Sequence, residues 1–312
     1  MHRNRRPFTK LSPKAIGLQE DGRSRTYSRP GHVVFCDIGW EILGHKCAHQ
    51  DGGRPLPSDC EVVYGPALNG LITEATSIQP QFLVQPLEIF EASIACRMSW
   101  AANRETTKSE DIAYCLLGIF EVNMPLLYGE GMKAFLRLQE ELVRRSQDQS
   151  LFVWHWHWRW PWSDGMFATD PSAFWWGHLV QQNTAAVSVA TYSLAHNGIE
   201  MRVTAQRLLG FPLDEEVYVF PLNCMYTQSG QGKTPDPTSQ PIEMVVSNAS
   251  SANKKQFIRI AIDIFDKQKP VGERYPPAMR LQPVEMQLFM KAWDFPEGNL
   301  TTRRITRVSP YW

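Results

Sequence analysis

The middle of the chain has the hydrophobic period of an amphipathic helix. Within residues 131–146, apolar side chains recur at Phe135, Leu138 and Leu142, which fall on one face of a helix and leave the other face polar. The polar face offers two i,i+4 ion pairs in the favourable order: Glu140–Arg144 and Glu141–Arg145. The spacing therefore predicts a helix over this stretch, with its apolar side packed against a neighbouring surface.

A second helix is predicted over residues 107–119. Thr107 and Glu110 have the T-x-x-E spacing of a capping box, in which the threonine oxygen accepts from an early backbone N–H and the glutamate reaches back to the cap. Glu110 and Asp111 also place negative charge at the positive end of the helix dipole. Pro125 prevents the helix from continuing, so a tight connector is expected between the two helices.

Shorter elements are predicted before these helices. Residues 33–44 have the pattern of a strand and a turn, and residues 50–60 form a loop by their glycine and proline content. Helices are expected over residues 67–76 and 87–101. Residues 33–149 are therefore predicted to form a mainly helical N-terminal region.

After Ser150 the hydrophobic period changes to the alternation that is typical of strands. Asn197-Gly198 lies between two such runs, residues 187–195 and 199–204, and predicts a hairpin because both turn residues tolerate positive φ. Further strands are predicted over residues 217–222, 242–247, 257–265 and 284–293. The predicted fold class is thus α+β, with a helical half followed, over residues 150–312, by an antiparallel β-sandwich or an incomplete barrel.

The strand predicted over residues 257–265 has two different faces. Isoleucines at every second position alternate with Arg259, Ala261 and Asp263. Because successive side chains of a strand point to opposite faces, this pattern predicts one buried face and one wetter face that carries Arg259.

Composition limits the classes of function. The 312 residues are 43% apolar and carry no net charge, so the chain can bury a core and has no global field that favours nucleic acid or a membrane. Residues 1–32 are the exception, with eight Arg and Lys against Glu20 and Asp21. A solvated, disordered basic arm is expected there, with RNA, anionic lipid or an import receptor as alternative contacts.

Targeting signals and cysteine spacing bear on location. No apolar run approaches the roughly 18 residues of a membrane span. The six cysteines have no C-x-x-C spacing, which favours reduced thiols over disulfides or a zinc site. A cytoplasmic location is therefore expected.

Alternating tryptophan and histidine residues form the most unusual local pattern. In a strand, the tryptophans of residues 154–162 would share one face, and His155, His157 and Arg159 the other. A tryptophan face can bind sugars, bases or cations, and a histidine pair can bind a metal, but no third metal ligand can be placed. Alternatively, the tryptophans pack the seam between the helical and β regions. The candidate ligand or partner surface comprises Trp154, Trp156, Trp158, Trp160, His155 and His157.

Side chains that could support catalysis have simpler explanations. Asp37, Glu105, Glu110 and Asp111 are candidate paired carboxylates, but capping accounts for the last two and nothing marks any of them as a catalytic acid. The chain has no phosphate-binding G-x-x-x-x-G-K-[ST] motif and no G-x-G-x-x-G motif. No catalytic residue and no cofactor are predicted.

Blocks of sequence between residues 33 and 154 follow an order shared with a known family. They include Val34-Phe35-Cys36-Asp37, Arg97-Met98-Ser99-Trp100, Arg104-Glu105-Thr106-Thr107, Met124-Pro125-Leu126-Leu127-Tyr128-Gly129-Glu130-Gly131 and Arg137-Leu138-Gln139-Glu140-Glu141. In this order they resemble the later part of fungal heterokaryon-incompatibility (HET) domains and the short domain of unknown function that follows them. The blocks that precede them in the family have no counterpart in residues 1–32, so the resemblance implies a truncated member.

The resemblance implies a non-enzymatic regulatory or interaction fragment in fungal non-self recognition and cell-death signalling. Its partner would be a protein, or a HET core supplied by another chain. Two alternatives remain: a remnant of the NAD- or nucleotide-hydrolysing activity of the related TIR domains, or a small-molecule binding module that uses the tryptophan strand. Truncation would leave residues 33–36 as an under-paired edge beside an exposed apolar patch.

Overall fold

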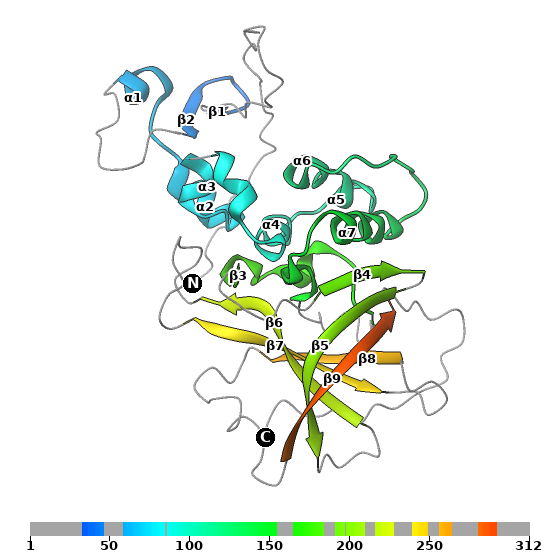
Figure 1. Cartoon of the computed structure of the whole chain (residues 1–312). Coiled ribbons are helices and arrows are strands. Elements are labelled where there is room, and N and C mark those ends of the chain that lie inside the picture. Colours follow the sequence, from blue (N-terminus) through cyan, green and yellow to red (C-terminus); the bar gives the residue numbers. More distant parts are fainter. Residues whose placement is uncertain are drawn as a thin grey trace, which may run out of the picture.

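The computed structural model describes residues 33–46, 59–84, 86–154, 165–183, 191–196, 198–209, 216–227, 239–248, 256–263 and 280–291. The expected basic arm, residues 1–32, lies outside this part of the chain. Figure 1 shows a group of helices above a strongly twisted sheet, with a small hairpin to one side. Within the described ranges, no helix combines the length and the apolar character that crossing a membrane requires.

A small hairpin opens the described chain. Strands β1 (Val33–Cys36) and β2 (Ile42–Lys46) pair antiparallel and confirm the predicted strand and turn. In the described part of the chain they form a sheet of two strands, and apolar side chains at Ile38, Trp40, Ile42 and Leu43 are exposed. The exposed side chains agree with the predicted apolar patch. The under-paired edge stays a prediction, because residues 1–32 and 47–58 lie outside the described part of the chain.

The helices are more broken than the sequence pattern indicates. They are α1 (Asp59–Tyr64), α2 (Asn69–Thr76), α3 (Pro80–Val84), the 3₁₀ helix η1 (Pro86–Glu91), α4 (Ile94–Ser99), α5 (Asp111–Tyr114), α6 (Leu117–Phe120) and α7 (Lys133–Arg145). Helices α2 and α7 confirm two predictions. The helix predicted over residues 87–101 is wrong as one element: Ser93 interrupts it, because its hydroxyl accepts from Cys96 N–H (3.1 Å) and donates to the Val180 carbonyl (2.6 Å).

Helix α7 has the predicted amphipathic form. Phe135, Leu138 and Leu142 are buried, and this face packs into the main hydrophobic core. Both predicted ion pairs are present, each with a separation of 3.8 Å: Glu140–Arg144 and Glu141–Arg145. They lie at the surface, so they contribute little to stability beside the burial of the apolar face.

One sheet forms most of the C-terminal half. After the short 3₁₀ helices η2 (Gln149–Phe152), η3 (Pro171–Phe174) and η4 (Gly177–Leu179), its strands are β3 (Val180–Gln182), β4 (Thr191–Ala195), β5 (Gly198–Leu209), β6 (Glu216–Tyr226), β7 (Gln240–Asn248), β8 (Gln256–Asp263) and β9 (Arg280–Lys291). Among the described residues their order is β3-β6-β7-β8-β9-β5-β4. The pairings are antiparallel except for a short parallel contact between β8 and β9. The predicted α+β class is confirmed.

Pairing between β5 and β6 closes this sheet on itself. Gln206 pairs with Val219 and Leu208 with Val217, although β7, β8 and β9 already connect the two strands by the other route. The sheet is thus a closed barrel of β5 to β9 with β3 and β4 as flanking strands, rather than two sheets packed face to face. Closure gives each of β5 to β9 at least two neighbouring strands, and β3 and β4 are the end strands among the described residues.

Two details of the strands differ from the sequence pattern. Ala195 pairs with Gly198, so Gly198 is the first residue of β5 and does not belong to the hairpin turn. Arg259 is buried, and so is Phe257 two residues earlier on the same face. The assignment of Arg259 to a wetter face is therefore wrong, because a closed barrel encloses one face of each of its strands.

A continuous hydrophobic core joins the helices to the barrel. It includes Phe135 from α7, Phe152 from η2 and Phe220 from β6. Buried polar side chains connect the same layers: Gln139 exchanges two hydrogen bonds with the backbone of Ala168 (2.8 and 2.9 Å), and Gln149 Oε1 accepts from Asn223 N–H (2.7 Å). The predicted boundary between residues 149 and 150 falls inside this core.

Candidate functional site

Only the first residue of the predicted tryptophan–histidine surface lies in the described part of the chain. Trp154 is 2% exposed and packs in the main core, where its Nε1–H donates to the Met166 carbonyl (2.9 Å). Trp156, Trp158, Trp160, His155 and His157 lie outside the described residues. The ligand surface therefore remains a prediction for these five, and Trp154 itself is not a surface residue.

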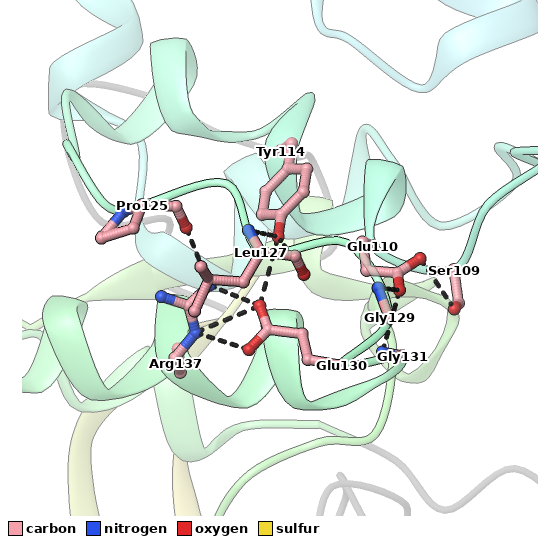
Figure 2. A network of polar contacts seen from close by, with 9 residues as sticks. All are labelled: Ser109, Glu110, Tyr114, Pro125, Leu127, Gly129, Glu130, Gly131 and Arg137. Atoms are coloured by element: carbon pink, nitrogen blue, oxygen red, sulfur yellow. Dashed lines mark hydrogen bonds and ion pairs between the residues drawn. The ribbon is translucent and has the colours of Figure 1, made fainter.

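The connector between α6 and α7 forms the best-defined polar site. Its anchor is Glu110, which is 6% exposed. Oε1 of Glu110 accepts hydrogen bonds from the backbone N–H groups of Gly129 (2.7 Å) and Gly131 (3.0 Å), as Figure 2 shows. Both glycines have positive φ, 99° and 60°, a conformation that glycine adopts without steric cost and that directs the two N–H groups to one point.

The capping box predicted for Thr107 and Glu110 is wrong. Helix α5 begins at Asp111, and Glu110 has no side-chain capping bond. The Glu110 carboxylate has two converging loop amides as partners instead, so it secures the connector rather than the helix end. The predicted helix over residues 107–119 is divided accordingly into α5 and α6.

A second anchor holds the other end of the connector. Arg137 on α7 binds Glu130 through Nε (2.9 and 3.1 Å) and Nη2, and it also donates to the Pro125 carbonyl (2.8 Å). The Tyr114 hydroxyl accepts from Leu127 N–H (2.7 Å) and contacts Glu130 (3.2 Å) at the centre of the network (Figure 2). Side chains from two helices thus fix the backbone of the connector at both ends and in the middle.

The fixed connector presents apolar side chains to solvent. Leu126, Leu127 and Tyr128 are 56%, 52% and 58% exposed, and we call these three residues the apolar tip. Tyr128 is itself positioned, since its hydroxyl donates to Asp111 Oδ1 (2.9 Å). Leu126 and Leu127 expose apolar side chains that lower solubility, so a rigid run of this kind is typical of an interaction site.

The hydrogen bonds around Glu110 favour its ionised carboxylate over the protonated form. Hydrogen bonds from its own backbone N–H and from those of Gly131 and Gly129 lower the pKa of Glu110 to about 2. The hydrogen bond to Glu130 raises the pKa of Arg137, which stays charged. Glu110 and Arg137 are therefore both charged at neutral pH.

The lowered pKa of Glu110 leads to a pH prediction. Its ordinary value is 4.5, so ionised Glu110 stabilises the fold above about pH 4.5, and this contribution is lost as pH falls towards 2. Glu110→Gln should reduce the free energy of unfolding most at pH 7, and the difference from the wild type should shrink below pH 4.5. Urea unfolding of both proteins at pH 7, 4.5 and 3 measures this difference. A difference independent of pH would contradict the role given to the carboxylate.

The other candidate carboxylates have local structural roles. Asp37 Oδ1 accepts from the N–H groups of Gly39 (2.8 Å) and Glu41 (3.0 Å) and so stabilises the β1–β2 turn. Asp111 binds Tyr128, and Glu105 is exposed. In the described ranges no three His, Cys, Asp or Glu side chains come close enough to hold a metal ion. The hydrogen bonds of Glu110, Tyr114 and Arg137 position the backbone of the connector.

Comparison with known proteins finds one matching family and one similar protein. Residues 133–195, from the start of α7 to the end of β4, match a domain of unknown function, DUF8212. The chain is also 45% identical over 78 residues to the vegetative incompatibility protein HET-E-1 of Podospora anserina. That match covers 24% of this chain and 6% of the relative, so the chain corresponds to a small part of that protein. No solved structure matches the chain.

The DUF8212 match agrees with the organisation of the fold. The DUF8212 match crosses from the helical layer into the sheet, as the shared core does. The likeness to HET-E-1 supports the predicted resemblance to heterokaryon-incompatibility proteins, and the domain of unknown function was expected as well. The truncation stays a prediction.

Sequence reasoning missed the apolar tip. Residues 120–130 were assigned to a connector, although Leu126, Leu127 and Tyr128 form an uninterrupted apolar run between Pro125 and Gly129. Proline and glycine on either side predict a loop, and three apolar residues in a loop are unusual unless they have a function. An apolar run between a proline and a glycine could therefore have indicated an exposed apolar loop in this connector.

Proposed function

We propose that this chain is a non-catalytic interaction module in fungal vegetative incompatibility, which acts in non-self recognition and cell-death signalling. The likeness to HET-E-1 supports the biological setting. The apolar tip on its clamped connector supports the interaction role and is the observation on which the proposal depends. The module would act in the cytoplasm, where its cysteines remain thiols.

The partner is a protein surface with an apolar hollow that covers Leu126, Leu127 and Tyr128. A fixed loop loses little conformational entropy on association, so its apolar area contributes to affinity more fully than that of a mobile loop. The two leucines of the tip favour an apolar surface over a charged or polar ligand, since both are exposed and carry no polar side-chain atom. A HET core supplied by another chain is the partner that the resemblance suggests.

A confrontation assay tests the proposal. The chain is expressed in one of two otherwise identical Podospora anserina strains, and the fraction of dead fusion cells is counted with a vital dye. We expect the chain to change this fraction. An unchanged fraction would contradict a role in incompatibility.

Substitutions in the apolar tip test whether it binds a partner without contributing to the stability of the fold. We expect Leu126→Ser combined with Leu127→Ser to return the fraction of dead fusion cells to that without the chain. The free energy of unfolding should stay within about 0.5 kcal/mol of the wild type, because both side chains are exposed. Leu71→Ser on α2, where the leucine is 63% exposed, is the matched control and should retain the wild-type effect. Equal behaviour of the two variants would exclude the tip as the interaction surface.

The enzymatic alternative has a direct test. Incubation of the purified chain with NAD should release no nicotinamide above a protein-free blank if the module is non-catalytic. Time-dependent release would favour a hydrolase instead, and the confrontation assay would then need a catalytically inactive variant for its interpretation.

A further inference from the structure

Arg259 is a charged side chain enclosed by the barrel. It lies on β8, where it pairs with Val246 of β7, and it is 2% exposed. Phe257, two residues earlier on the same face, belongs to the main hydrophobic core. The guanidinium group of Arg259 is therefore surrounded by core residues and not by solvent.

The contacts of Arg259 satisfy only part of its hydrogen-bonding capacity. Nη2 donates to the Trp154 carbonyl, and the guanidinium carbon lies 3.8 Å from the centroid of the Trp154 indole ring. Nε and Nη1 are buried and find no acceptor among the described residues. The salt bridges found in the described ranges do not include Arg259.

These contacts do not balance the charge of the side chain. Burial lowers the pKa of Arg259 to about 9, so the group is still cationic at neutral pH. A carbonyl and an aromatic face attract a cation, but neither carries the negative charge that a buried ion needs. An enclosed charge with open donors is costly unless an anion accompanies it.

The open donors indicate the chemistry of the missing partner. A guanidinium group presents its N–H groups in a plane, and two of them match two oxygens of a phosphate or carboxylate. The guanidinium carbon lies over the Trp154 ring and Nη2 is bound by the Trp154 carbonyl, and the Met166 carbonyl holds the indole in turn through a 2.9 Å hydrogen bond. The arginine is thus oriented before any ligand arrives.

We propose that Arg259, supported by Trp154, binds the oxyanion group of a small molecule where the barrel meets the helical layer. Phosphate and carboxylate groups share the required chemistry. Arg259 would supply the charge and hydrogen bonds from its open Nε–H and Nη1–H donors, and Trp154 would position it. This site is separate from the apolar tip, so it can exist whether or not the module acts in incompatibility.

Thermal unfolding of the full chain with added anions tests the site. The probes are sodium phosphate, AMP and sodium acetate at 10 mM, each compared with sodium chloride at the same ionic strength. At least one oxyanion should raise the midpoint by roughly 3–6 °C, since a ligand that binds the folded state stabilises it. A response to AMP alone would assign the site to a nucleotide phosphate, and a response to acetate alone to a carboxylate. No shift with any probe would overturn the proposal.

Substitutions link the response to Arg259. Arg259→Met should abolish the anion-dependent shift and should raise the midpoint in anion-free buffer, because it removes an uncompensated buried charge. Arg259→Lys keeps the charge but loses the planar fork, and calorimetry should show binding at least about tenfold weaker. Arg207→Met is the control, since Arg207 pairs with Glu216 (2.5 Å) at the surface, and it should retain the full shift.

Two results would contradict the site. An equal shift in Arg259→Met and the wild type would place the anion elsewhere. A fall in the midpoint of Arg259→Met in anion-free buffer would show that the chain itself supplies the balancing acceptor. If that variant does not fold, the calorimetric comparison of the wild type, Arg259→Lys and Arg207→Met decides the question.

Discussion

Replacing Gly177 by alanine is expected to reduce the free energy of unfolding by about 3 kcal/mol, as for other overpacked core positions. Gly177 begins η4, which packs against α4. A Cβ atom at this position would lie 2.2 Å from the carbonyl oxygen of Ala95 and 2.7 Å from its carbonyl carbon. These are backbone atoms of a helix, so they cannot move aside as the end of a flexible side chain could.

A second glycine provides the control for this substitution. Gly118 lies in α6, and a Cβ atom there meets no atom within 4 Å. Gly118→Ala should therefore stabilise the protein by about 0.5–1 kcal/mol, because alanine favours the helix over glycine. Urea denaturation measures both changes. If the two variants shifted stability in the same direction, the close approach of η4 and α4 would not be the cause.

Loss of the Asp148 carboxylate is expected to reduce the free energy of unfolding by about 4 kcal/mol. Asp148 is buried and accepts from the N–H groups of Ile94 (2.7 Å) and Ser150 (2.9 Å). Asp148→Ala leaves both donors buried without an acceptor, and each such donor costs about 1–3 kcal/mol. It also removes the negative charge at the start of α4, where the helix dipole favours it.

Asp170 provides the control for Asp148, because it caps a helix without being fully buried. Its carboxylate accepts from Ser172 N–H (2.9 Å) at the start of η3, in a half-buried position. Asp170→Ala should cost about 1 kcal/mol, as for an ordinary N-cap residue. Denaturation of both alanine variants at pH 7 compares the two losses. Similar losses would mean that solvent reaches the Asp148 amides once the side chain is removed.

Local patterns predicted the elements whose partners are close in sequence. Helix α7 follows from the spacing of Phe135, Leu138 and Leu142, and its ion pairs lie four residues apart. The strands of the barrel follow from alternation. The capping box failed because Glu110 bonds to amides that lie 19 and 21 residues further along the chain. The hydrophobic period of a helix does not indicate hydrogen bonds to residues so far away in the sequence.

Contacts between residues far apart in the sequence also explain the two other wrong predictions, the helix over residues 87–101 and the face assigned to Arg259. Ser93 divides a predicted helix because it bonds to Val180, 87 residues away. Arg259 is placed inside by the closure of the sheet, which depends on pairing between β5 and β6 rather than on the pattern of β8. For the candidate sites, the sequence indicated Trp154, and its burial in the shared core agrees with the predicted packing of the tryptophans at the seam between the helical and β regions. The apolar tip was not predicted as a site.

The hydrophobic core shared by the helices and the barrel limits how this protein can be divided into fragments. A fragment that stops at residue 149 would leave Phe135 and Leu138 facing water, and one that begins at residue 150 would leave Phe220 and Met244 uncovered. Both pieces would lose part of the shared core, so each should be less stable than the whole chain. Activities should therefore be mapped with single substitutions in the whole polypeptide, and domain exchanges between relatives should carry the two layers together.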